Sequence, residues 1–114
     1  MPPLSTWMFT IAREVHACAK AHGWWDGVEL TPDVVASKLA LIHSEISEAL
    51  EAIRNGYPQD KHCPEFGNFE IELADAMIRI MDLTEAMGLN IESALLAKHE
   101  FNKSRPYKHG GKVI

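Results

Sequence analysis

The sequence predicts an all-α protein in which residues 1–114 form a single domain. Apolar residues recur every three or four positions along most of the chain, as in helices with one buried face. No segment alternates between apolar and polar residues in the way that half-buried strands do. Its 46% hydrophobic and 24% charged residues are ordinary for one soluble globular domain of this length.

The first two helices are separated by a loop that carries two tryptophans. A cap at Ser5 or Thr6 is expected to start the first helix, which runs to about residue 22 before a glycine. The second helix begins at Thr31-Pro32-Asp33, because threonine can cap a helix and proline fits its first turn. It is expected to end near Asn55, where another glycine follows.

Two further helices are expected at about residues 68–87 and 91–103. Gly88 ends the third helix, and Asn90 can cap the fourth. Beyond the fourth helix, Pro106 and a pair of glycines are expected to loosen the C-terminal tail. The predicted architecture is therefore a four-helix bundle with a short tail.

The second and third helices each carry an apolar stripe that is expected to face the core. In the second helix the stripe consists of Val35, Leu39, Ile42, Ile46, Ala49 and Ile53. In the third helix it consists of Leu73, Met77, Ile80, Met81 and Thr84.

Two acidic pairs, Glu45-x-x-Glu48 and Glu72-x-x-Asp75, lie beside these stripes. The i,i+3 spacing places both carboxylates of a pair on one side of its helix. Facing carboxylates would repel by roughly 3 kcal/mol per close pair at an effective dielectric near 20, and hard divalent cations relieve such repulsion. The pattern predicts an Mg²⁺ or Mn²⁺ site, whereas the alternative is an ordinary solvated helix face.

The net charge of −5 is unevenly distributed. Residues 1–97 carry fifteen acidic and six basic residues, a balance of −9, whereas residues 98–114 have a balance of +4. An acidic body argues against binding to duplex nucleic acid, and a basic tail could either close over a small polyanion or be simply solvated. No apolar run is long enough for a membrane span, so a cytoplasmic location is expected.

The acidic pairs and their surroundings resemble a known family. Glu45-x-x-Glu48 followed by Glu72-x-x-Asp75 is similar to the ExxE…ExxD signature of the MazG-like, all-α nucleoside triphosphate pyrophosphohydrolases. The surrounding blocks at residues 41–52 and 72–82 also resemble those of phage and bacterial members. The segment from Lys98 to Lys112 is similar to their C-terminal block, so the resemblance covers most of the chain. This segment contains Asn102, Arg105-Pro106-Tyr107-Lys108 and His109-Gly110-Gly111.

This resemblance implies Mg²⁺-dependent hydrolysis of a nucleoside or deoxynucleoside triphosphate to the monophosphate and pyrophosphate, serving nucleotide pool control or sanitation. Glu45, Glu48, Glu72 and Asp75 match the positions that hold the metal in the family, with Mn²⁺ as an alternative ion. Glu48 is chosen as the general base that takes a proton from the attacking water. Asp82 is expected to support the metal ligands without binding the ion itself.

Residues that would bind the substrate follow from the same resemblance. His16 and Trp25 match the histidine and tryptophan that flank the base in related dCTP pyrophosphatases, and an indole can stack on a nucleobase. The tail at residues 98–114 would contact phosphates or sugar. Its matching residues are Lys98, Asn102, Arg105, Tyr107 and Lys108.

The resemblance also implies a homodimer or homotetramer, and a short helical chain gains from burying a second apolar face against a copy of itself. An alternative of a different class is a non-catalytic nucleotide-sensing or partner-binding helical module that keeps the acidic cleft. A di-iron bundle would require Glu-x-x-His pairs, which this chain lacks.

Overall fold

The structure is a computed structural model that describes residues 7–114. Within that range the chain is helical, and its only β-type pairing is an isolated bridge between Gln59 and Gly67. The helices are α1 (Trp7–Ala21), α2 (Pro32–Arg54), α3 (Asn68–Ala86), α4 (Ile91–Lys103) and α5 (Lys108–Gly111). The all-α prediction is confirmed.

The predicted helix starts at Thr31 and Asn90 are confirmed by their hydrogen bonds. The Thr31 hydroxyl accepts a bond from the backbone N–H of Val34 at 3.2 Å, and the Asn90 side chain accepts one from Ser93 at 3.0 Å. Each bond satisfies a backbone donor that has no partner within the first helical turn. The predicted cap at Ser5 or Thr6 lies outside the described residues.

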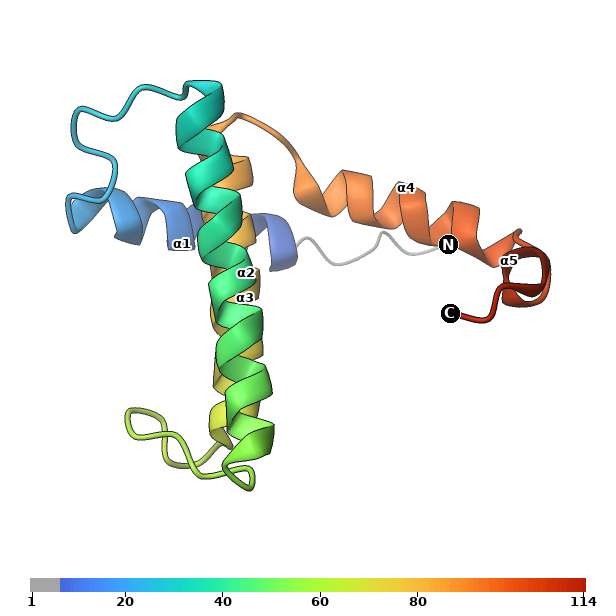
Figure 1. Cartoon of the computed structure of the whole chain (residues 1–114). Helices are drawn as coiled ribbons and strands as arrows, with labels where there is room; N and C mark the ends of the chain where they lie inside the picture. The colour runs from blue at the N-terminus through green and yellow to red at the C-terminus, as the bar shows by residue number, and fades with distance from the viewer. Residues whose placement is uncertain (1–6) are drawn as a thin grey trace.

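Helices α2 and α3 lie side by side and antiparallel, joined by the loop at one end of the pair, while α1 crosses them and packs on α3 (Figure 1). The buried apolar residues of the described chain are mostly small. Alanine at a helix contact lets the backbones approach closely, so α2 and α3 form a tight pair. These residues are Ala12, Ala49, Ala52, Ala76, Met81 and Leu83.

Helix α4 leaves this body and projects to one side, with α5 at its far end (Figure 1). Its start is tied to α1 by a hydrogen bond from the backbone N–H of Phe9 to Glu92 Oε2 at 2.8 Å. The tail beyond α4 is more structured than expected. Lys108 and His109 both have φ of 51°, so the segment labelled α5 is a left-handed turn rather than a continuation of α4.

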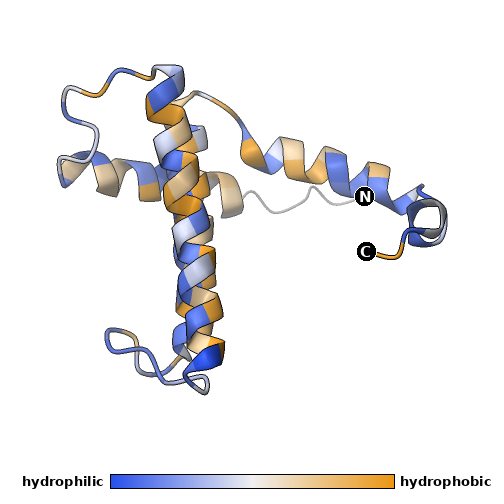
Figure 2. Ribbon diagram, viewed as in Figure 1, coloured by the Kyte–Doolittle hydropathy of each residue, from blue (hydrophilic) through white to orange (hydrophobic). Residues whose placement is uncertain are grey.

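The apolar stripes predicted to face the core are largely exposed in the single chain, contrary to expectation. Leu39 and Ile46 on α2 are 48% and 49% exposed, and Met77 on α3 is 48% exposed. Figure 2 shows apolar stretches interspersed with polar ones along the length of α2. Only part of each stripe is buried between α2 and α3. The remainder stays exposed because α4 projects away from the helix pair and does not cover it.

The single chain is expanded for its size. Its radius of gyration is 16.8 Å, whereas a compact chain of this length has about 13 Å. Its accessible surface is 8766 Å², against about 6,300 Å² for a compact monomer of 12.8 kDa. No helix within residues 7–114 combines the length and apolar composition that a membrane crossing requires.

Candidate metal site and adjoining pocket

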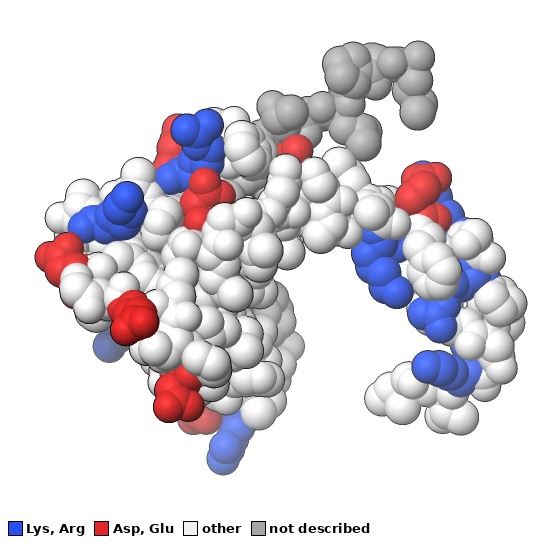
Figure 3. Space-filling model, turned by 90° about the horizontal axis from the view of Figure 1, so that it is seen from above, with Lys and Arg blue, Asp and Glu red and all other residues white. Residues whose placement is uncertain are grey.

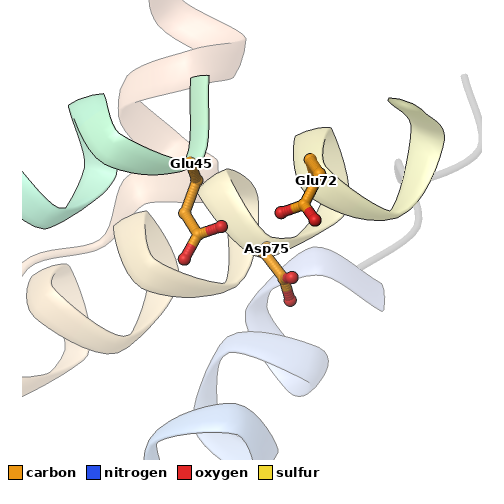
Figure 4. A group of neighbouring side chains, drawn as sticks. All are labelled: Glu45, Glu72 and Asp75. Atoms are coloured by element: carbon orange, nitrogen blue, oxygen red, sulfur yellow. The ribbon is translucent and has the colours of Figure 1, made fainter. Parts of the chain in front are cut away.

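Three of the four predicted metal ligands converge in the structure. Glu45 on α2 and Glu72 and Asp75 on α3 point toward one another across the helix pair (Figure 4). One carboxylate oxygen of each lies within 4.8 Å of the others, and all three side chains are half-buried. The antiparallel packing of α2 on α3 thus brings one residue of the first acidic pair and both residues of the second to one place, so the predicted convergence holds for three of the four residues.

Glu48 does not join this group. It lies one turn beyond Glu45 on α2 and is exposed to solvent. Residues three apart are offset by about 60° around a helix, and this offset leaves Glu48 outside the group that Glu45 joins. The structure therefore brings together Glu45, Glu72 and Asp75 and leaves Glu48 at the solvent edge.

Two of the three carboxylates, Glu72 and Asp75, have raised pKa values. Burial raises the pKa of Glu72, and the neighbouring Glu45 raises it further. Burial likewise raises the pKa of Asp75, with Glu45 again adding to the effect and Arg79 partly offsetting it. A divalent cation at this place would favour the ionised forms and lower both pKa values.

Two outer side chains hold the glutamates by hydrogen bonds. Arg79 Nε donates to Glu45 Oε1 at 2.8 Å, and Asn68 Nδ2 donates to Glu72 Oε1 at 3.1 Å. Each bond occupies one carboxylate oxygen, and a carboxylate has a second. An oxygen-only set of three carboxylates, held in this way, fits Mg²⁺ or Mn²⁺.

A pocket of about 670 Å³ opens beside the acidic group. Glu45 and Asp75 line it, as do Trp24 and Trp25 from the loop after α1. Its volume lies within the range of small-molecule sites, and its lining combines apolar and charged groups as such sites do.

Trp25 is fixed in the wall by Asp82. The indole Nε1–H donates to Asp82 Oδ1 at 2.9 Å and to Oδ2 at 3.2 Å. His16 Nδ1 lies 2.7 Å from the same Oδ1, and its ring meets the indole edge-on with centroids 5.6 Å apart. The two residues predicted to flank a base are therefore joined through Asp82, which supports them rather than the acidic group.

Two cations also line this pocket although neither was predicted to bind substrate, Lys38 and Arg79. The Lys38 ammonium lies 4.5 Å from the centroid of the Trp25 ring. Lys38 precedes Glu45 by seven residues, which is two helical turns, so helical spacing could have identified it. Arg79 follows Asp75 by four residues and could have been found in the same way.

The predicted substrate-binding residues of the tail lie away from this pocket. Lys98, Asn102 and Arg105 belong to α4 and its end, and the pocket wall contains no residue of 98–114. Figure 3 shows basic side chains gathered on the projecting arm, apart from the body. Lys98 and Arg105 both lie near the Phe101 ring, and Tyr107 beside Lys108 is 86% exposed.

Comparison with known proteins gives no relative to set beside this site. No protein-family model, no curated protein and no solved structure matches the chain significantly.

Proposed function

We propose that this chain is a MazG-like, Mg²⁺-dependent nucleoside triphosphate pyrophosphohydrolase. The observation that carries the proposal is the convergence of Glu45, Glu72 and Asp75 beside a pocket that is lined by Glu45, Asp75 and the anchored Trp25. A carboxylate group suited to a divalent cation and an aromatic wall are what binding of a nucleotide with its phosphates requires.

Glu45, Glu72 and Asp75 hold the ion in this proposal. Bound Mg²⁺ would neutralise charge on the phosphate oxygens and lower the pKa of a nearby water. Glu48, at the solvent edge of the group, accepts the proton of the water that attacks the α-phosphorus. The bond from that phosphorus to the bridging oxygen breaks in line, and pyrophosphate leaves.

The remaining pocket residues bind and orient the nucleotide. Trp25 offers its ring to the base, and Asp82 holds that ring in place together with His16. Lys38 and Arg79 line the pocket, Arg79 being bonded to Glu45, and both would contact phosphate oxygens. A base that stacks on Trp25 would displace the Lys38 ammonium from the ring and release it toward the phosphates.

The functional form in this proposal is a homodimer or homotetramer. The surface in excess of a compact monomer is about 2,500 Å², comparable to the area that one chain buries in a large obligate dimer. The exposed stripes of α2 and α3 and the projecting α4 supply that surface, and together they would complete a four-helix bundle. In such an assembly the basic tail of one copy, with Arg105 and Lys108, reaches the acidic pocket of another.

Products formed from a panel of ribonucleoside and deoxyribonucleoside triphosphates with Mg²⁺ test the activity. Monophosphate and pyrophosphate in equal amounts, separated by anion exchange, are expected from at least one nucleotide. Release of diphosphate and inorganic phosphate, or no turnover of any nucleotide, would contradict the proposal.

Glu48→Gln should abolish turnover and leave the helical circular dichroism unchanged. Glu51→Gln is the matched control, because Glu51 is exposed on the same helix and pairs only weakly with Arg54 at 3.6 Å. If Glu48→Gln keeps near-normal activity, the general base has been assigned to the wrong residue.

A non-catalytic nucleotide sensor is the second candidate, and the exposed position of Glu48 outside the acidic group favours it. A sensor would bind nucleotide with Mg²⁺ in calorimetry and yield no products in the panel. Binding without turnover therefore separates the two functions.

A further inference from the structure

Asp60 is a buried carboxylate that the proposed reaction does not use. It is only 6% exposed, and among the described residues no other charged residue is buried to this extent. Its Oδ2 accepts hydrogen bonds from the backbone N–H groups of His62 and Cys63, both at 2.9 Å. Its Oδ1 accepts one from Asn68 Nδ2, also at 2.9 Å.

Asn68 therefore bridges two carboxylates with one nitrogen. Its Nδ2 carries two hydrogens, of which one is directed to Asp60 Oδ1 and the other to Glu72 Oε1. Only the NH₂ end of the amide can lie between two carboxylate oxygens, so its orientation is chemically determined. An aspartate here would add a third negative charge, and a serine would offer a single donor.

Backbone hydrogen bonds also hold Asn68 in place. Its N–H donates to the carbonyl of Pro58 at 2.8 Å, and the N–H of Asp60 donates to the carbonyl of Phe66 at 3.0 Å. These bonds close the loop between α2 and α3 on the first turn of α3. Glu72 lies one turn further along the same helix.

We propose that Asn68 is the positioning residue of the metal ligand Glu72, and that Asp60 holds Asn68 in the orientation this requires. The inference rests on the proposed metal site. With Oε1 held by the amide, the Glu72 carboxylate keeps one rotamer, and its other oxygen is left for the ion. Hydrogen-bonded partners of this kind commonly change metal affinity by about 10- to 100-fold.

Mn²⁺ binding without nucleotide, measured by calorimetry, tests whether Asp60 acts on Glu72 through Asn68. We call this chain of two hydrogen bonds the relay. Asn68→Ala and Asp60→Asn should each weaken Mn²⁺ binding by about 10-fold or more. Glu70→Gln is the matched control, since it removes a charge from the same turn of α3 without contacting Glu72, and it should change affinity by less than about threefold. Circular dichroism and urea unfolding show which variants are folded, and Asn68→Ser replaces Asn68→Ala if the latter is not.

The double variant Asp60→Asn with Asn68→Ala decides whether the two residues act as one unit. If they do, it binds Mn²⁺ no more weakly than Asn68→Ala alone, whereas multiplied losses would overturn the relay. A spectroscopic readout is independent of stability: the side-chain amide protons of Asn68 should shift in NMR spectra when Mg²⁺ is added, and unmoved signals would also overturn it.

Failure of this inference is distinguishable from failure of the proposed function. A wild-type protein that binds no Mn²⁺ overturns both. A wild-type protein that binds Mn²⁺ and releases pyrophosphate, alongside Asn68 and Asp60 variants of unchanged affinity, overturns the positioning role alone.

Discussion

Replacing Glu72 by glutamine should stabilise the metal-free protein, although it removes a proposed ligand. The ligand oxygens of the acidic group lie within 4.8 Å of one another, and Glu72 faces both Glu45 and Asp75. At this distance two unit charges repel by about 3.5 kcal/mol at a dielectric of 20 and by about 0.9 kcal/mol in bulk water. Because the three side chains are only half-buried, solvent screens part of this repulsion, so a gain of about 1–2 kcal/mol is expected.

The hydrogen bond from Asn68 survives this change, because an amide oxygen accepts as a carboxylate oxygen does. For a chain of this size each kcal/mol corresponds to about 4 °C, so the Tm should rise by about 4–8 °C. The measurement is thermal unfolding at pH 7.5 and low salt with EDTA, at one chain concentration. Half-molar sodium chloride should shrink the gain by screening.

The dependence of the gain on pH follows from the raised pKa values of Glu72 and Asp75. Between their ordinary values of 4.5 and 3.8 and their higher values in the folded protein, the folded state binds more protons than the unfolded state. Wild-type stability therefore falls as pH rises through this window. The advantage of Glu72→Gln is expected to vanish below about pH 4 and to be complete at pH 7.5.

Glu70→Gln, on the exposed side of the same helical turn, serves as the control and should gain little. The reasoning is refuted if Glu72→Gln is no more stable than the wild type at pH 7.5. It is equally refuted if the gain is as large at pH 3.5, because repulsion between carboxylates cannot then be its cause.

Three further predictions concern assembly and substrate binding. Leu50→Lys places a charge on a side chain that is 58% exposed on α2 and should convert the proposed oligomer to a monomer in light scattering; an unchanged oligomeric mass would exclude Leu50 from the interface. Trp25→Phe keeps a ring but loses the N–H bonds to Asp82, so affinity for a non-hydrolysable nucleotide should fall about tenfold in calorimetry, and equal affinity would count against the base-binding role. Arg105→Ala should raise KM about tenfold with little change in kcat, whereas an unaltered KM would mean that the tail does not bind phosphate.

Local sequence signals predicted the helices well. The caps at Thr31 and Asn90 and the carboxylate spacing on α2 and α3 are determined by residues within one or two turns, which a sequence displays directly. The exposure of Leu39 and Ile46 could not be predicted, because it depends on the direction that α4 takes after Gly88. Apolar periodicity shows that a helix face is to be covered, but it does not show which chain covers it.

The supporting residues of the site were harder to predict for a similar reason. Asn68 and Asp60 meet because the loop between α2 and α3 folds back on itself, and no spacing rule links residues eight apart across a loop. Asp82 was expected to support the acidic group, yet it binds His16 and Trp25, since the loop after α1 brings both residues to α3. Such contacts depend on tertiary packing.

The alanines where α2 packs on α3 bear on which ion the proposed metal site would select. Ala49, Ala52 and Ala76 are almost fully buried, so the separation of the two helices, and with it the size of the cage between Glu45 and Asp75, is determined by methyl groups. Mg²⁺ requires oxygen atoms at about 2.0–2.1 Å, whereas Ca²⁺ accepts about 2.3–2.6 Å. One additional methylene between α2 and α3 would widen the proposed site and favour the larger ion. These apolar positions would then influence ion discrimination without contacting the ion.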